Sequence, residues 1–182
     1  MKNYLKNINH TAGFTLMELL IVIGILGVLA ATLLATIDPF EQIKKSIDAS
    51  LKETSTEFFN ANVRYFTAHN ALPWHTVANG GAFCYTTATP TSAQISTMGT
   101  CITALISDGE LKGSFSSSSN LSLMLLTSPN PLTTQTSDLV VCFKPQSKAE
   151  QRDGGTKYAI NGALGTGCKS AGGATDCYWC AQ

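Results

Sequence analysis

The sequence Gly13-Phe14-Thr15-Leu16-Met17-Glu18 is followed by nineteen residues, Leu19 to Ile37, that carry no charge. Glu18 is therefore a lone acid near the start of an apolar helix, where burying it in hydrocarbon costs about 2.5 to 3.5 kcal/mol. If the bond after Gly13 is cut, Phe14 carries a free ammonium that lies within reach of a carboxylate four positions along the helix. We expect Glu18 to pair with such a terminus, in its own chain or in a staggered neighbour, where the pair fixes the register of assembly.

The run from Gly13 to Val22 resembles the class III signal of type IV prepilins and pseudopilins. The resemblance implies that a membrane peptidase cleaves after Gly13 and methylates the new terminus at Phe14, and that Glu18 pairs with the terminus of a neighbour. It also implies a ladle-shaped α+β pilin fold, in which a long amino-terminal helix packs on a small antiparallel sheet. Beyond about Phe66 the likeness is one of layout, so the rest of the chain is interpreted from its own residues.

Two other interpretations of the apolar segment remain open. An ordinary secretory signal ends at a small-residue cleavage site, and Leu29-Ala30-Ala31 or Leu34-Ala35-Thr36 resembles one. Glu18 argues against that interpretation. A plain single-pass anchor is the simpler alternative, because about 20 apolar residues cross a bilayer core and Leu19 to Ile37 is long enough.

The chain divides into four predicted parts. The leader has Lys2 and Lys6 and no acid, so we expect it to stay cytoplasmic while everything after Ile37 faces outward. About 145 residues follow the apolar segment, enough for one compact head. The parts are a leader (1–13), a transmembrane and filament-core helix (14–37), an amphipathic half-helix (38–69) and a disulfide-bonded head (70–182).

Charge and motifs exclude several classes of function. The net charge is zero, and after loss of the leader it is 10 minus 12, or −2, with no basic run elsewhere, so no nucleic-acid site is indicated. No nucleophile elbow, phosphate-binding glycine loop or metalloprotease motif occurs. We therefore predict a structural protein that is not an enzyme and that has no cofactor and no metal site.

The half-helix should bury one face. Glu41/Lys45 and Asp48/Lys52 are expected to form i, i+4 ion pairs on the other faces. Pro39 should kink or break an otherwise nearly continuous helix from Phe14 to about His69, near Asp38. The apolar residues at helical spacing are Ile43, Ile47, Leu51, Phe58 and Tyr65.

The head reads as a short helix and three or four antiparallel strands. Ile102, Leu105 and Ile106 predict the helix, ending at Asp108-Gly109. Thr86 to Thr100 is expected to be a loop and Ser114 to Asn120 a low-complexity linker. Residues 151–155 favour a hairpin with a wide loop between the second and third of the strand-like runs. Those runs are Leu121 to Leu126, Leu139 to Phe143, Lys157 to Ile160 and Cys177 to Cys180, preceded by a short apolar run, Ala82 to Tyr85.

An even number of cysteines after the apolar segment indicates disulfides in an oxidising compartment. Fifteen connectivities are possible. We expect Cys84 and Cys101 to close a local loop, and Cys142 to join a central strand to the carboxy-terminal tail. The complete set is Cys84, Cys101, Cys142, Cys168, Cys177 and Cys180.

Cys177-Tyr178-Trp179-Cys180 permits a redox or a zinc interpretation. No helix follows to lower the thiol pKa, and the three histidines are scattered, so structural bridges are favoured. Trp74 and Trp179 are expected to be packing residues. Asn120-Leu121-Ser122 is a weak match to a glycosylation sequon.

The sequence therefore predicts a pilin, the subunit of a helical homopolymer whose filament serves adhesion, motility or DNA uptake. Its expected partners are copies of itself, a prepilin peptidase, the pilus assembly machinery and, before assembly, the membrane. We place it in the cytoplasmic (inner) membrane with its head outside, and in an extracellular pilus after assembly. The alternatives are a pseudopilin of a type II secretion system and a monomeric, membrane-anchored binding domain.

Overall fold

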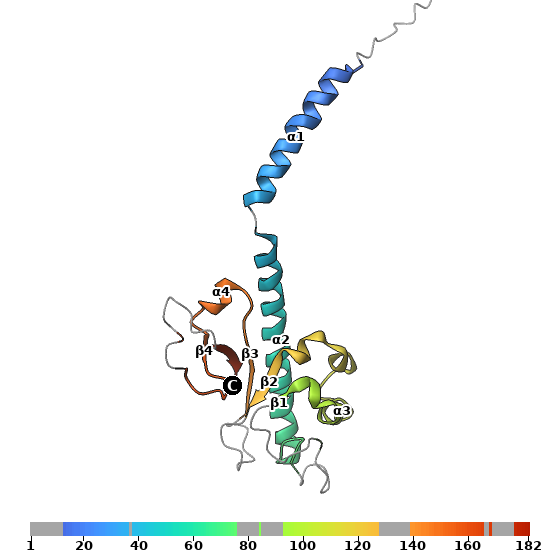
Figure 1. Cartoon of the computed structure of the whole chain (residues 1–182). Helices are drawn as coiled ribbons and strands as arrows, with labels where there is room; N and C mark the ends of the chain where they lie inside the picture. The colour runs from blue at the N-terminus through green and yellow to red at the C-terminus, as the bar shows by residue number, and fades with distance from the viewer. Residues whose placement is uncertain are drawn as a thin grey trace, which may run out of the picture. The chain divides into compact units, whose positions relative to one another are not determined.

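The computed structural model describes residues 13–36, 38–75, 84, 93–127, 139–165, 168 and 177–182. It divides into two units, Met1–Pro39 and Phe40–Gln182. The first contains helix α1 (Leu16–Thr36), and the second contains helix α2 (Pro39–His69) from Phe40 on, together with an antiparallel sheet (Figure 1). The predicted α+β class, with a long apolar helix at the amino terminus, is confirmed.

The predicted break at Asp38 is confirmed, because α1 ends at Thr36 and α2 begins at Pro39. Proline suits the first position of a helix, where its missing N–H would have no partner in any case. At the other end, α2 stops at His69 as predicted. Asn70 follows with a φ of 52°, a left-handed conformation that ends helices.

The sheet has five strands in the order β1-β2-β3-β5-β4, and all of its pairs are antiparallel. Three or four strands were predicted, and the additional one, β1, lies inside the segment expected to be a loop. The first strand-like run starts late, since residues 119–122 form a 3-10 helix before β2. The strands are β1 (Ala93–Gln94), β2 (Met124–Thr127), β3 (Val140–Phe143), β4 (Thr156–Tyr158) and β5 (Tyr178–Ala181).

The predicted hairpin between β3 and β4 is wrong, because β5 lies between them. Cys142 of β3 is opposite Cys180 of β5, and β4 pairs with β5 in the sheet. All four residues of β3 are buried, so this strand needs a neighbour on each side. The carboxy-terminal strand supplies the second neighbour, and between β3 and β4 the chain forms the short helix α4 (Lys148–Gln151).

The core lies between α2 and one face of the sheet, along which β2 and β3 run (Figure 1). Val141 and Phe143 of β3 join Leu51 and Phe58 of α2 in the main cluster. Val140 and Cys142 face the other way and pack with Cys180 and two tyrosines. This alternation follows from the two-residue period of a strand. Of the predicted α2 face, Leu51, Phe58 and Tyr65 are buried, Ile47 is half-buried and Ile43 is exposed.

The short helix α3 (Gly99–Ser107) confirms the prediction from Ile102, Leu105 and Ile106. The linker expected at Ser114 to Asn120 is wrong, because 3-10 helices η2 (Gly113–Ser117) and η3 (Ser119–Ser122) occupy it and a further one, η1 (Ile95–Thr97), follows β1. Phe115 is buried and stacks on Phe58, with 5.7 Å between ring centroids. The serine-rich composition concealed this anchor. The run Ala82 to Tyr85 lies outside the described residues, apart from Cys84.

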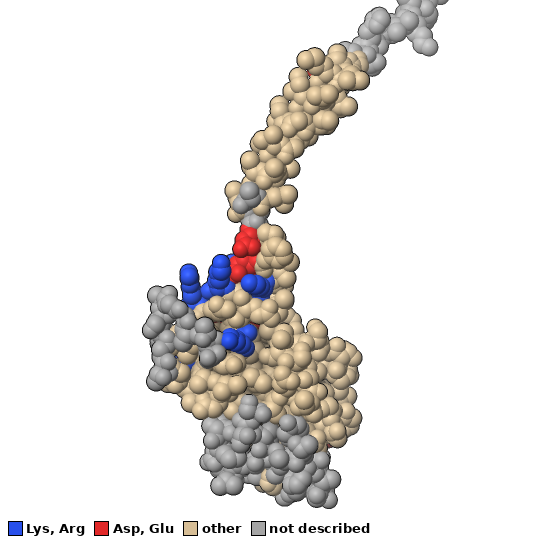
Figure 2. Space-filling model, in the orientation of Figure 1, with Lys and Arg blue, Asp and Glu red and all other residues tan. Residues whose placement is uncertain are grey.

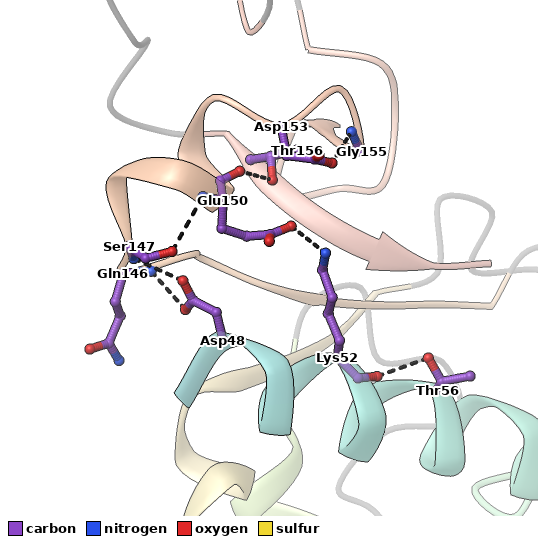
Figure 3. Close-up of polar contacts among 9 residues, drawn as sticks. All are labelled: Asp48, Lys52, Thr56, Gln146, Ser147, Glu150, Asp153, Gly155 and Thr156. Carbon is purple, nitrogen blue, oxygen red and sulfur yellow. Dashed lines mark hydrogen bonds and ion pairs between the residues drawn. The ribbon is translucent and has the colours of Figure 1, made fainter. Parts of the chain in front are cut away.

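The expected surface pair of Asp48 and Lys52 is also wrong. Asp48 is 1% exposed, and its two carboxylate oxygens accept hydrogen bonds from the backbone N–H groups of Gln146 (2.9 Å) and Ser147 (2.8 Å). Lys52 instead pairs with Glu150 of α4 (Figure 3). A carboxylate buried in this way satisfies two amides that would otherwise have no partner. The segment before α4 is thereby fastened to α2.

Candidate processing and assembly segment

Gly13 and Phe14 precede α1 and are both exposed, Phe14 to 85%. A methyl group added at Gly13 would have no neighbour within 4 Å. The bond between these two residues is therefore not covered by the described part of the chain. That is a requirement for any peptidase that cuts there.

Thr15 and Glu18 form a reciprocal cap at the start of α1. The Glu18 Oε2 atom accepts hydrogen bonds from the Thr15 backbone N–H and from its hydroxyl, both at 2.9 Å. In return, the Glu18 N–H donates to the Thr15 hydroxyl at 3.2 Å. This is the capping box, in which a threonine and a glutamate three positions later satisfy the free donors of the first turn. The spacing Thr-x-x-Glu indicates this role of Thr15, which was not among the predictions from the sequence.

The cap holds a negative charge at the amino end of α1. Both bonds to the Glu18 carboxylate reach Oε2, which leaves Oε1 for another donor. The positive end of the helix dipole favours an anion at this place. A free amine at Phe14, in this copy or another, would be such a donor to Oε1. The pairing of Glu18 with Phe14 of a neighbour stays a prediction, because one chain cannot display it.

The side of α1 presents apolar surface all round. Its large hydrophobic side chains are exposed to between 47% (Val22) and 82% (Leu16). Leu16–Leu34 is long and apolar enough to cross a membrane. A helix that is apolar on every face needs lipid or other helices around it. A bilayer before assembly and neighbouring helices after it meet the same requirement.

The head is joined by three disulfides, Cys84–Cys101, Cys142–Cys180 and Cys168–Cys177. The presence of disulfides, expected from the even cysteine count, is confirmed. The two cysteines of the Cys-x-x-Cys sequence have different partners, so the sequence does not present a redox dithiol here. Within the described ranges, no three His, Cys, Asp or Glu side chains gather as a metal-binding group.

Asn120 of the sequon is half-buried and hydrogen-bonded to α2. Its side-chain nitrogen, the atom to which a glycan would be attached, donates to the hydroxyls of Ser50 (2.9 Å) and Thr54 (3.0 Å) of α2. Asn120 therefore fastens η3 to α2. Trp74 is 3% exposed, and Trp179 packs against Phe143 with 5.4 Å between ring centroids. Asn120 thus has a hydrogen-bonding role, and the two tryptophans have the packing roles expected of them.

Residues 8–34 match the family described as the prokaryotic N-terminal methylation motif. This is the class III signal of type IV pilins and pseudopilins, so the resemblance drawn from Gly13 to Val22 is confirmed. The motif supports a structural protein of pilin or pseudopilin type, processed by a prepilin peptidase and anchored in a membrane before assembly. The match covers the amino-terminal segment alone. Neither the curated proteins nor the solved structures that were compared give a match to this chain.

Proposed function

We propose that this protein is the structural subunit of a type IV pilus, a helical homopolymer held together by its amino-terminal apolar helices. The observation that carries the proposal is the position of the Glu18 carboxylate. Thr15 fixes it in the first turn of α1, an apolar helix whose side chains the chain itself leaves exposed. Cleavage after Gly13 creates the amine, and the methylation motif at residues 8–34 supports that cleavage. The finished filament serves adhesion, motility or DNA uptake.

The assembly step combines an electrostatic contribution with van der Waals packing between apolar helices. Moving α1 from lipid into a bundle of α1 helices exchanges one apolar surrounding for another. This transfer therefore contributes little free energy and does not favour one axial register of the helices over another. A charge pair between Glu18 and the Phe14 amine is strong where water is excluded. The pair therefore selects one axial register, while the uncovered helix faces supply the packing.

Two variants separate this role from helix capping. Glu18→Gln keeps an oxygen that can accept hydrogen bonds from Thr15 but removes the charge, whereas Thr15→Ala removes the capping partner and keeps the charge. We expect Glu18→Gln to be inserted and displayed but to form few or no filaments. Thr15→Ala should still assemble, with a less stable first turn. Glu53→Gln, an exposed acid on α2, is the matched control for loss of charge.

Electron microscopy of sheared cell-surface material shows whether filaments form. Mass spectrometry of the same preparation gives the intact mass of the subunit. The expected mass is that of the chain from Phe14 on, with one methyl group in place of a hydrogen and six hydrogens lost to the three disulfides. Normal filaments from Glu18→Gln would overturn the proposed role of the charge. A monomeric anchored domain, in contrast, predicts equal behaviour of all three variants.

The pseudopilin of a type II secretion system remains the second candidate, since the methylation motif occurs in both groups. Three disulfides in the head favour an exposed polymer, because each staple stabilises a subunit that cannot be replaced once it is outside the cell. Long surface filaments support the pilus. If loss of this protein impairs protein secretion, and no surface filament is seen when it is present, the protein is a pseudopilin.

A further inference from the structure

The cations of the head come mainly from two short segments. Of the nine Lys and Arg residues that the structure describes, seven lie in residues 44–52 and 144–157. In Figure 2 the visible Lys and Arg side chains gather beside α4 and the first half of α2, and the rest of the described head surface in this view shows no blue. We infer that this basic surface, made of Lys44, Lys45, Lys148 and Arg152, docks the head onto anionic phospholipid headgroups before assembly.

The contacts between α2 and α4 bring these four residues together. Glu41 accepts a hydrogen bond from the backbone N–H of Lys148, and Asp48 holds the two residues before it. Lys44 and Lys45 lie between Glu41 and Asp48 on the same helix, within 60° of that face at 100° per residue. They therefore flank the place where Asp48 fastens the segment before α4; Figure 3 shows that fastening.

The side chains of the basic surface are free to meet a partner. All four are exposed, and no ion pair within the described part of the head engages them. Lys52, in contrast, is used by Glu150. Besides the buried Asp48 and the Glu150 that pairs with Lys52, three acids are near these cations in the sequence: Asp38, Glu41 and Asp153. Glu41 faces the Lys148 amide, and Asp153 accepts from the Gly155 N–H. An excess of exposed positive charge remains.

The chain keeps this surface near the bilayer. Leu34, the last residue of the membrane-spanning segment, is ten residues before Lys44. Five residues at full extension and five in α2 reach about 25 Å at most, whichever way the head turns. The polar headgroup layer itself adds about 5 to 7 Å beyond the hydrocarbon. The basic surface is thus tethered within reach of lipid phosphates, which attract each Lys or Arg with about 1 kcal/mol.

The inference rests on α1 spanning a bilayer, as the proposed function requires of the unassembled subunit. The test uses the full chain at one copy per nanodisc, in dioleoyl-phosphatidylcholine or in a 70:30 mixture of that lipid with dioleoyl-phosphatidylglycerol. Acylation rates of individual lysines are measured by mass spectrometry. Four cations against three acids leave one net positive charge, so the docking equilibrium gains about fivefold in the anionic disc, and acylation of Lys44, Lys45 and Lys148 should slow by up to about fivefold. Lys112, on another part of the head, should not change, and 0.5 M NaCl should remove the difference.

Variants decide whether the basic surface is responsible. In Lys44→Glu/Lys45→Glu, Lys148 should be acylated equally fast in both discs, whereas Lys112→Glu should behave as the wild type. Equal rates for Lys148 in the two discs with the wild-type protein would overturn the inference and leave this surface to a protein partner. Protection that survives the double substitution would overturn it as well. Either result leaves filament assembly untouched, because insertion into the disc and the Glu18 test do not depend on it.

Discussion

Replacing Asp48 with alanine removes the carboxylate that fastens the α4 segment to α2. Two backbone amides lose their acceptor, and that of Ser147 is buried. A hydrogen bond to a charged group contributes about 1.5 to 3 kcal/mol, and a buried donor left unpaired costs a similar amount. Because water can reach the half-buried Gln146, we expect Asp48→Ala to lower the free energy of unfolding by about 3 kcal/mol.

Urea unfolding of the full chain in mild detergent, followed by tryptophan fluorescence, measures this change. Trp74 is buried and Trp179 packs on Phe143, so both report on the head. Asp48→Asn keeps one acceptor oxygen but turns an NH2 donor toward the second backbone N–H, so it should lose nearly as much stability as Asp48→Ala. Glu53→Ala, an exposed acid on the same helix, is the matched control and should stay within about 0.5 kcal/mol of the wild type. If Asp48→Ala were as stable as Glu53→Ala, the reasoning about the buried carboxylate would be refuted.

Three further predictions concern the head. Burial, with a contribution from the Asp108 carboxylate, raises the pKa of Tyr65 above its usual 10.0. The stability that this shift contributes is present below about pH 10 and is lost as pH rises through the folded-state pKa. Tyr65→Phe should therefore flatten the alkaline loss of stability in unfolding curves from pH 9 to 12, and an unchanged slope would contradict this. Gly162 has a φ of +75°, and an added Cβ there would lie 2.9 Å from a side-chain carbon of Val140 in β3. Gly109 has a φ of +81° but open space around it, so Gly162→Ala should destabilise the head by more than Gly109→Ala. Equal thermal midpoints would show that the contact with Val140 does not matter. Replacing Cys142 and Cys180 together by alanine removes a bridge across 38 positions and should lower the free energy of unfolding by about 4 kcal/mol. In hydrogen exchange, the amides of β4 should lose protection together with those of β5. Continued protection of β4 would argue that β5 does not support it.

Sequence patterns within a few residues correctly predicted the features that depend on neighbouring residues alone. The apolar run and Glu18 identified α1 and the processing segment, because their chemistry lies within a few consecutive residues. Pro39 placed the helix break, since a proline acts on its own turn. The spacing of Ile102, Leu105 and Ile106 gave α3 for the same reason.

Long-range contacts account for the failures. Asp48 looked like a surface acid because its partners, Gln146 and Ser147, lie 98 and 99 positions away. The serine-rich segment looked like a linker because composition does not reveal that Phe115 finds Phe58. The hairpin prediction failed because β5, far along the chain, is inserted between β3 and β4. Periodicity in one segment carries no information on such a pairing.

The pairing of Glu18 with a neighbour's amino terminus is tested most directly by a cryo-EM map of the assembled filament. The account predicts chains that begin at Phe14, with the nitrogen of each Phe14 within about 4 Å of a Glu18 carboxylate oxygen in an adjacent copy, the range of an ion pair. Filaments whose subunits still begin at Met1, or in which Glu18 contacts only Thr15 of its own chain, would contradict it.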